Sequence, residues 1–119
     1  MKLTNRIFMD DGLFQKEKQA IFVPSWNFIG LSNNLENEKS YFISQICETR
    51  IFAQKNKERI EVFSNSCPHR MHPLRKNATG RGPIVCPYHG WSFDYDGKLK
   101  KIPYHDECYQ FKNKDFKLQ

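Results

Sequence analysis

The spacing of hydrophobic positions along the chain changes near residue 25. Asp10-Asp11-Gly12 is typical of a helix start, and Pro24 ends the stretch that follows it. Between these two points, the residues at near-helical spacing are Leu13, Phe14, Glu17, Ala20 and Ile21. We therefore expect a leading helical segment over residues 1–25.

The residues from Trp26 onward predict short strands. β-Branched and aromatic residues gather in short stretches, which are separated by polar turns such as Asn33-Asn34 and residues 55–58. The expected strands cover residues 26–30, 41–47, 50–54, 59–64 and 82–86, and a tight hairpin is expected around residues 94–97. The polar tail over residues 104–119 predicts no definite element. The pattern favours one short helix on an antiparallel β framework.

Composition limits the classes of protein to which the chain can belong. The 119 residues have the size of one domain, and ten Phe, five Tyr and two Trp suffice for a small aromatic core. No stretch approaches the ~20 apolar residues that span a bilayer, and the first residues lack the apolar part of a secretory signal, so we expect a cytoplasmic protein. The net charge is +6, but no basic run is longer than Lys100-Lys101, which argues against nucleic-acid binding.

Two short motifs combine cysteine with histidine. The first is Cys67-Pro68-His69, and the second is Cys86-Pro87-Tyr88-His89-Gly90-Trp91. Each motif supplies one Cys and one His, whereas a zinc finger usually takes its cysteines from one arm and its histidines from the other. If the two motifs face each other across two irons, both cysteines can bind one iron and both histidines the other. This is the ligation of a Rieske [2Fe–2S] cluster.

The residues around the motifs agree with this interpretation. The two prolines stiffen the loops and offer no competing amide donor, and Gly82 and Gly90 allow the backbone to approach closely. The aromatic residues expected to cover the cluster are Tyr88, Trp91 and Phe93. The alternative is a structural zinc module in which Cys67, His69, Cys86 and His89 bind one ion.

At these residues the chain resembles the Rieske domain of aromatic ring-hydroxylating oxygenase α subunits. The similar stretches are residues 14–30, the Cys-Pro-His-Arg of residues 67–70, and Cys-Pro-Tyr-His-Gly-Trp-Ser-Phe-Asp-Tyr-Asp-Gly at residues 86–97. The resemblance implies an all-β fold, a Rieske antiparallel β sandwich, in a single domain over residues 1–119 with a cluster-binding subdomain at about 66–94. Met71 stands where that family most often has glycine, which we expect to affect only the end of the first loop.

Respiratory-chain Rieske proteins provide a contrast. They carry two further cysteines that bridge the loops, and the matching positions here are His72 and Tyr88. They also place hydroxyl groups on cluster sulfurs, at positions that match Trp91 and Phe93. Because the two donors are lost, we expect a potential near the low end of the roughly −150 to +300 mV Rieske range.

The number of histidines limits the metal sites that the chain can form. After His69 and His89 are assigned to the cluster, only His72 and His105 are left, which is too few for a second, mononuclear iron site of the facial-triad type. We therefore expect an electron-transfer protein or domain that turns over no aromatic substrate alone. The alternative is the Rieske fragment of an oxygenase α subunit without its catalytic iron domain.

The resemblance also implies partners. A ferredoxin or flavoprotein reductase would donate electrons, an oxygenase-type subunit would accept them, and a homo-oligomer is compatible with this scheme. Of the two cysteines outside the motifs, Cys47 is expected to pack as a small apolar group and Cys108 to be an exposed thiol. A disulfide between them is disfavoured in a reducing cytosol.

Overall fold

The computed structural model describes residues 4–104 and 116–119. The chain begins with an arm that contains the α-helices α1 (Arg6–Met9) and α2 (Asp11–Glu17) and the π-helical turn η1 (Lys18–Phe22). Asp10 caps α2, because its carboxylate accepts a 2.9 Å hydrogen bond from the Leu13 backbone N–H. This bond, with a second from Arg6, lowers the pKa of Asp10. Helix α2 and the turn η1, which follow Asp10, confirm the predicted short N-terminal helix.

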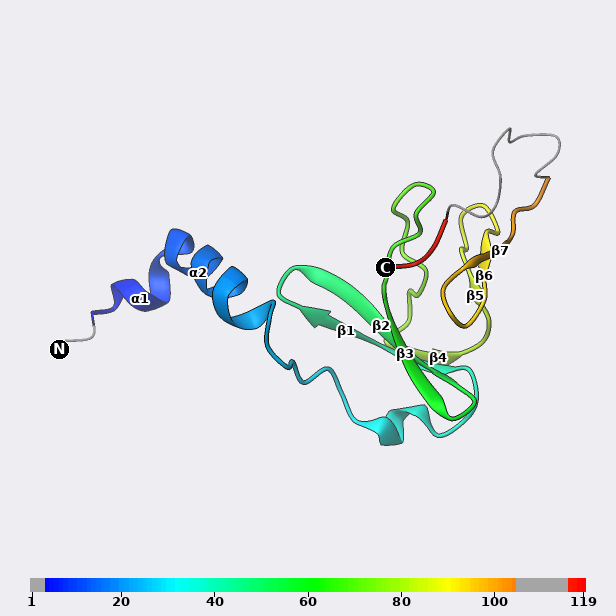
Figure 1. The fold of residues 1–119 in the computed structure, drawn as a ribbon, viewed down its shortest axis with the longest axis horizontal. Helices are drawn as coiled ribbons and strands as arrows, with labels where there is room; N and C mark the ends of the chain where they lie inside the picture. The colour runs from blue at the N-terminus through cyan, green and yellow to red at the C-terminus, as the bar shows by residue number, and fades with distance from the viewer. Residues whose placement is uncertain (1–3, 105–115) are drawn as a thin grey trace.

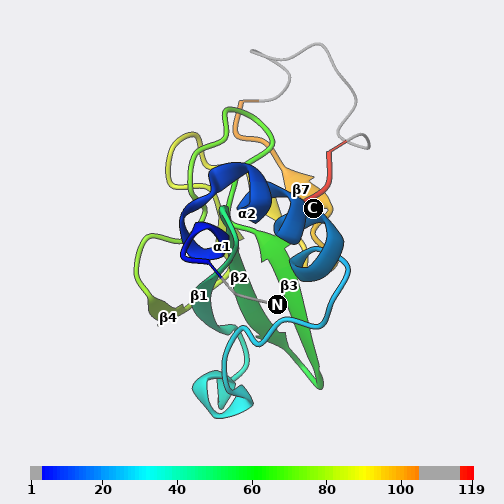
Figure 2. The same cartoon turned by 90° about the vertical axis from the view of Figure 1, so that its left-hand side faces the viewer.

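The arm projects from the β domain, which makes the molecule long in one direction (Figure 1). Figure 2 looks from the arm toward the strands, with α1 and α2 in front of β1–β3. Neither α1 nor α2 buries a residue. The arm meets the β domain at Lys18, which is 5% exposed and forms a 2.8 Å ion pair with Glu48 in the β1–β2 turn. That pairing lowers the pKa of Glu48.

Sheet A has four antiparallel strands in the order β3-β2-β1-β4. The strands are β1 (Ser40–Ile46), β2 (Thr49–Asn56), β3 (Arg59–Ser64) and β4 (Thr79–Arg81). Both faces of β2 are covered. Phe52 packs with Phe63 on one face, and Ala53 packs with Phe42 and with Leu35 of the 3₁₀ turn η2 (Ser32–Leu35) on the other. The strands predicted at residues 41–47, 50–54 and 59–64 are thus confirmed.

Sheet B contains β5 (Ile84–Val85), β6 (Ser92–Phe93) and β7 (Leu99–Lys101), paired antiparallel in that order. Asp94 closes the turn between β6 and β7, since its Oδ1 accepts hydrogen bonds from the backbone N–H groups of Asp96 (3.0 Å) and Lys98 (2.8 Å). The hairpin predicted at residues 94–97 is confirmed. The strand predicted at 82–86 is present but shorter.

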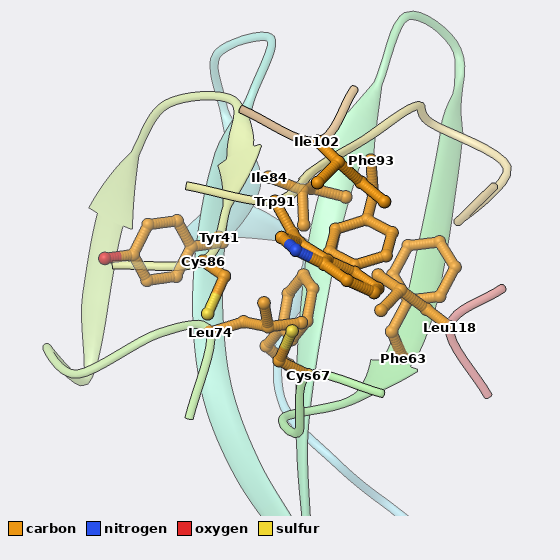
Figure 3. Packing of buried hydrophobic residues seen from close by; sticks show 11 residues of the cluster. Tyr41, Phe63, Cys67, Leu74, Ile84, Cys86, Trp91, Phe93, Ile102 and Leu118 are labelled. Carbon is orange, nitrogen blue, oxygen red and sulfur yellow. The ribbon is translucent and has the colours of Figure 1, made fainter. Parts of the chain in front are cut away.

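The main core contains buried residues of both sheets and of the loops that follow β3 and β5 (Figure 3). Its members are Tyr41, Phe52, Phe63, Cys67, Leu74, Ile84, Cys86, Trp91, Phe93, Ile102 and Leu118. The fold is mostly β, with two antiparallel sheets and a short N-terminal helix, as expected. Both motif cysteines belong to this core, so the predicted site is built on the main buried cluster of the domain.

Some expectations were wrong. Residues 26–30 form no strand, because none of the described strands pairs with them, and Trp26 (104% exposed) and Phe28 (81%) face solvent. Strand β4 was not predicted. Cys47 is only half-buried and lies in the β1–β2 turn with a φ of 52°. His105, Cys108, Tyr109 and Phe111 lie outside the described residues.

Across residues 4–104 and 116–119, no helix combines the length and the apolar character needed to cross a bilayer.

Candidate metal centre

The two Cys–His loops have the same backbone hydrogen-bonding pattern. In the first loop, the Cys67 carbonyl accepts from the Met71 N–H (2.8 Å) and the Cys67 N–H donates to the His72 carbonyl (2.9 Å). In the second loop, the Cys86 carbonyl accepts from the Gly90 N–H (2.9 Å) and the Cys86 N–H donates to the Trp91 carbonyl (2.8 Å). The two loops therefore have equivalent turns, which place the cysteine at the same position in each loop, whereas His69 is the second residue after its cysteine and His89 the third.

The fourth residue after each cysteine adopts a left-handed backbone conformation. Its φ is 54° at Met71 and 72° at Gly90. Glycine adopts this conformation freely, whereas a side chain costs roughly 1–2 kcal/mol. Met71 is 73% exposed, so its side chain extends into solvent and the loop keeps the turn that glycine would give. The departure from the family pattern therefore changes the strain at this position and not the turn itself.

We expect Met71→Gly to stabilise the domain by about 1 kcal/mol or less. Relief of the left-handed strain exceeds the ~0.5–1 kcal/mol entropic cost of a glycine. The substitution also removes a hydrogen bond from Ser66 Oγ to Met71 Sδ, which is weak because it is 3.6 Å long and exposed. Urea unfolding followed by circular dichroism measures the change.

Gly90→Ala is the matched opposite change in the second loop. It introduces the same left-handed strain, and the new Cβ would lie 2.9 Å from Pro103 Cγ. We expect a decrease of about 1–3 kcal/mol in the free energy of unfolding. If both variants changed stability in the same direction, the proposed equivalence of the two turns would be wrong.

The two motif cysteines lie side by side in the core. Cys67 is 1% exposed and Cys86 is 2% exposed, and their sulfur atoms lie at the same edge of the buried cluster (Figure 3). Burial raises the pKa of the Cys67 thiol to about 11, and the neighbouring Cys86 thiol adds to the rise. Backbone N–H groups of His69 and Arg70 donate to the Cys67 sulfur and act in the opposite direction. Two thiolates so close together and so buried need a cation between them.

The two motif histidines form a second pair. Their ring centroids are 4.8 Å apart, and both rings are half-buried. Burial lowers the pKa of His69, and His89 and Arg70 lower it further, which favours the neutral imidazole that metals bind. Nδ1 of His89 is buried and has no hydrogen-bond partner among the described residues. A buried nitrogen of this kind fits a metal ligand, because otherwise its burial is unfavourable.

The structure therefore groups sulfur with sulfur and imidazole with imidazole. In the part of the chain that the structure describes, no three His, Cys, Asp or Glu side chains surround a single point that could hold one metal ion. A tetrahedral zinc site gathers its ligands around one point. Two pairs of like side chains, each with one member from each loop, match the ligation expected for a Rieske cluster.

Aromatic side chains surround the site as expected, with one difference. Trp91 is buried and stacks parallel on His69 with ring centroids 4.5 Å apart, and Phe93 is buried as well. Tyr88 is 54% exposed and stacks on His89 at 3.9 Å, so it covers the site from the solvent side. His72 contacts Tyr88 at 5.2 Å, which joins the two loops at the positions matched to the bridging cysteines of respiratory proteins.

The sequence pattern assigned no role to Arg75 or Asn65, yet both are buried next to the loops. Arg75 comes directly after the core residue Leu74, and Asn65 lies two residues before Cys67. A polar residue next to a core position or close to a ligand loop is the signal that the sequence offers for them. Polar residues of these types are mostly exposed, so this signal alone does not identify them.

The chain matches a known protein family over most of its length. The Rieske [2Fe-2S] domain family matches residues 25–112. The chain is 32% identical over 110 residues to benzene 1,2-dioxygenase subunit alpha of Pseudomonas putida, covering 91% of this chain and 24% of that protein. It is 33% identical over 96 residues to the carnitine monooxygenase oxygenase subunit of Escherichia coli K12, covering 79% of this chain and 26% of that protein.

Solved structures of oxygenases share the fold. A quaternary ammonium Rieske monooxygenase superposes with a TM-score of 0.87 and 28% identity, over 98% of this chain and 33% of that one. Naphthalene 1,2-dioxygenase superposes with a TM-score of 0.86 and 27% identity, over 95% of this chain and 26% of that one. The chain spans about a quarter of the length of the curated relatives it matches.

Proposed function

Since the chain belongs to the Rieske [2Fe-2S] domain family and resembles the N-terminal Rieske domain of ring-hydroxylating oxygenase α subunits, we propose that it transfers single electrons within an oxygenase system. The proposed cofactor is one [2Fe–2S] cluster, with Cys67 and Cys86 on one iron and His69 and His89 on the other. The observation that carries this ligand set is the pairing of like side chains from two equivalent loops.

The bound cluster would supply a group that accepts and releases one electron. The residues of the chain provide its ligands and limit its contact with water. Cys67 must lose its proton on binding, because burial holds the proton on the free thiol, and the N–H groups of His69 and Arg70 already donate to the sulfur. Trp91 and Phe93 exclude water from the core side, while the half-buried histidine rings remain close to solvent, where a redox partner would dock.

The comparisons favour the Rieske part of an oxygenase α subunit over a separate electron carrier. The relatives are named as oxygenase subunits, and this chain matches about a quarter of their length. We propose that electrons enter from a ferredoxin or flavoprotein reductase and leave to an oxygenase-type iron site. A low potential fits this direction, because neither Trp91 nor Phe93 carries a hydroxyl group that would stabilise the reduced form.

Metal and sulfide analysis tests the proposal. Protein purified without oxygen should be red-brown and contain about two irons and two acid-labile sulfides per chain. After reduction by one electron, pulsed EPR should detect nitrogen couplings from two imidazoles. A colourless protein with one zinc and no sulfide would show that the site is the structural zinc module instead.

A further inference from the structure

Arg75 is a buried cation without a carboxylate partner among the described residues. It lies between the first Cys–His loop and β4, and only 8% of it is exposed. The ion pairs within residues 4–104 and 116–119 are Arg6–Asp10 and Lys18–Glu48, and neither includes it. Its Nε is buried with no hydrogen-bond partner in the same part of the chain. Burying such a charge is unfavourable unless something compensates for it.

The guanidinium group holds the start of the second loop. Nη1 donates to the Pro83 carbonyl at 3.0 Å, and Nη2 donates to the Gly82 carbonyl at 3.0 Å. Nη2 also donates to Oε1 of Gln54 on β2, while Nε2 of Gln54 donates to the same Gly82 carbonyl at 2.9 Å. Gly82 and Pro83 lead through β5 directly to Cys86, so these bonds fix the second loop against sheet A.

The backbone of Arg75 holds the start of the first loop. Its N–H donates to Asn65 Oδ1 at 2.7 Å, and its carbonyl accepts from Asn65 Nδ2 at 2.9 Å. The Asn65 N–H donates in turn to the Arg50 carbonyl on β2 at 2.8 Å. Asn65 lies two residues before Cys67, in the stem of the first loop. Arg75 is therefore hydrogen-bonded to the stems of both ligand loops.

The charge of Arg75 lies in the same core as the motif cysteines. Its Cζ lies 4.2 Å from the Tyr41 ring centre and 5.3 Å from the Phe52 ring centre, and both rings belong to the buried cluster that contains Cys67 and Cys86. Burial lowers the pKa of Arg75, but a guanidinium keeps its charge in proteins. Water screens a charge only weakly in such surroundings. The cation therefore attracts the negative charge of any group that the cysteines bind.

We propose that Arg75 is a positioning residue of the metal centre, which fixes the spacing of the two Cys–His loops and compensates the negative charge of the reduced site. This inference rests on the proposed function. Reduction adds one electron, and the buried cation favours the more negative state. Loss of the cation should therefore lower the potential, and loss of the guanidinium fork should loosen the loops.

Two variants separate charge from geometry. Arg75→Lys keeps the charge but cannot reach both carbonyls as a planar fork does, whereas Arg75→Met removes both features. The control is Arg81→Met, at an exposed arginine whose Nε donates to the Glu38 carbonyl. The measurements are the midpoint potential by protein-film voltammetry and the rate at which an iron chelator bleaches the visible absorbance.

For Arg75→Met we expect the equilibrium constant for reduction to fall about tenfold, a downward shift of ~59 mV. For Arg75→Lys we expect the equilibrium constant for reduction to stay within about twofold of the value for the unmodified protein. Both variants should lose the cluster to the chelator at least several-fold faster than the unmodified protein does. Arg81→Met should match the parent protein in both measurements. If Arg75→Met does not fold, Arg75→Gln, which also lacks the charge, replaces it in both measurements.

Parental behaviour of Arg75→Lys toward the chelator would overturn the positioning role. An unchanged potential in a cluster-loaded Arg75→Met would overturn the charge role. These outcomes differ from failure of the proposed function, in which the parent protein itself contains no iron and no sulfide.

Discussion

His89→Ala should abolish the cluster. The Nδ1 atom of His89 is buried and has no hydrogen-bond partner among the described residues, so the variant removes a ligand and leaves a gap. Neighbouring Tyr88 is turned outward and 54% exposed, which leaves no substitute ligand beside it. Iron and sulfide per chain, together with the visible absorbance of protein loaded without oxygen, should fall to background.

His72→Ala is the matched control for this variant. It removes an imidazole near the first loop that is not a proposed ligand, where the ring contacts Tyr88 and its Nδ1 lies 2.8 Å from the Pro73 carbonyl. We expect this variant to keep its full iron and sulfide content. The ligand assignment would be wrong if His89→Ala retained a cluster with nitrogen couplings from two imidazoles.

Phe93→Tyr should raise the potential of the cluster by roughly 60–130 mV. Phe93 is buried in the same core as Cys67 and Cys86, and we expect it to match the position at which high-potential Rieske proteins have a hydroxyl donor. A hydrogen bond to a charged group contributes about 1.5–3 kcal/mol. A tenfold change in the equilibrium constant for reduction corresponds to ~1.4 kcal/mol or, for a one-electron couple, to ~59 mV. The bond strengthens when the cluster gains an electron, so the shift is upward.

Voltammetry at fixed pH measures this shift, with Tyr88→Phe as the control. Tyr88 also stacks on a motif histidine, but its ring is largely exposed, so removal of its hydroxyl should leave the potential nearly unchanged. The unmodified protein should lie in the lower part of the Rieske range. A downward shift in Phe93→Tyr with an intact cluster would show that the hydroxyl does not bond to a cluster sulfur.

The parts of the fold that the sequence predicted are those with a local physical cause. Strands β1–β3 combine β-branched and aromatic residues with polar turns, and the β6–β7 turn is closed by Asp94, a residue whose carboxylate satisfies nearby backbone N–H groups. The two Cys–His loops are equally local, because ligand spacing within a short segment is visible in the sequence.

The parts that were missed depend on distant neighbours. Residues 26–30 have strand composition but no strand to pair with, so their aromatic side chains are exposed. Strand β4 has the sequence Thr-Gly-Arg, which carries no strand signal and pairs only because β1 offers a free edge. Arg75 connects residues of β2 with both loop stems, and no window of the sequence contains all of these partners.

Four large apolar side chains between residues 8 and 28 are almost fully exposed to solvent. Phe8, Met9, Trp26 and Phe28 are each at least 80% exposed, so they contribute almost nothing to the free energy of unfolding. We expect these exposed apolar side chains to promote association of the purified chain at high concentration. Serine substitutions at these four positions should reduce that association and leave the core unchanged, because none of the four residues belongs to it.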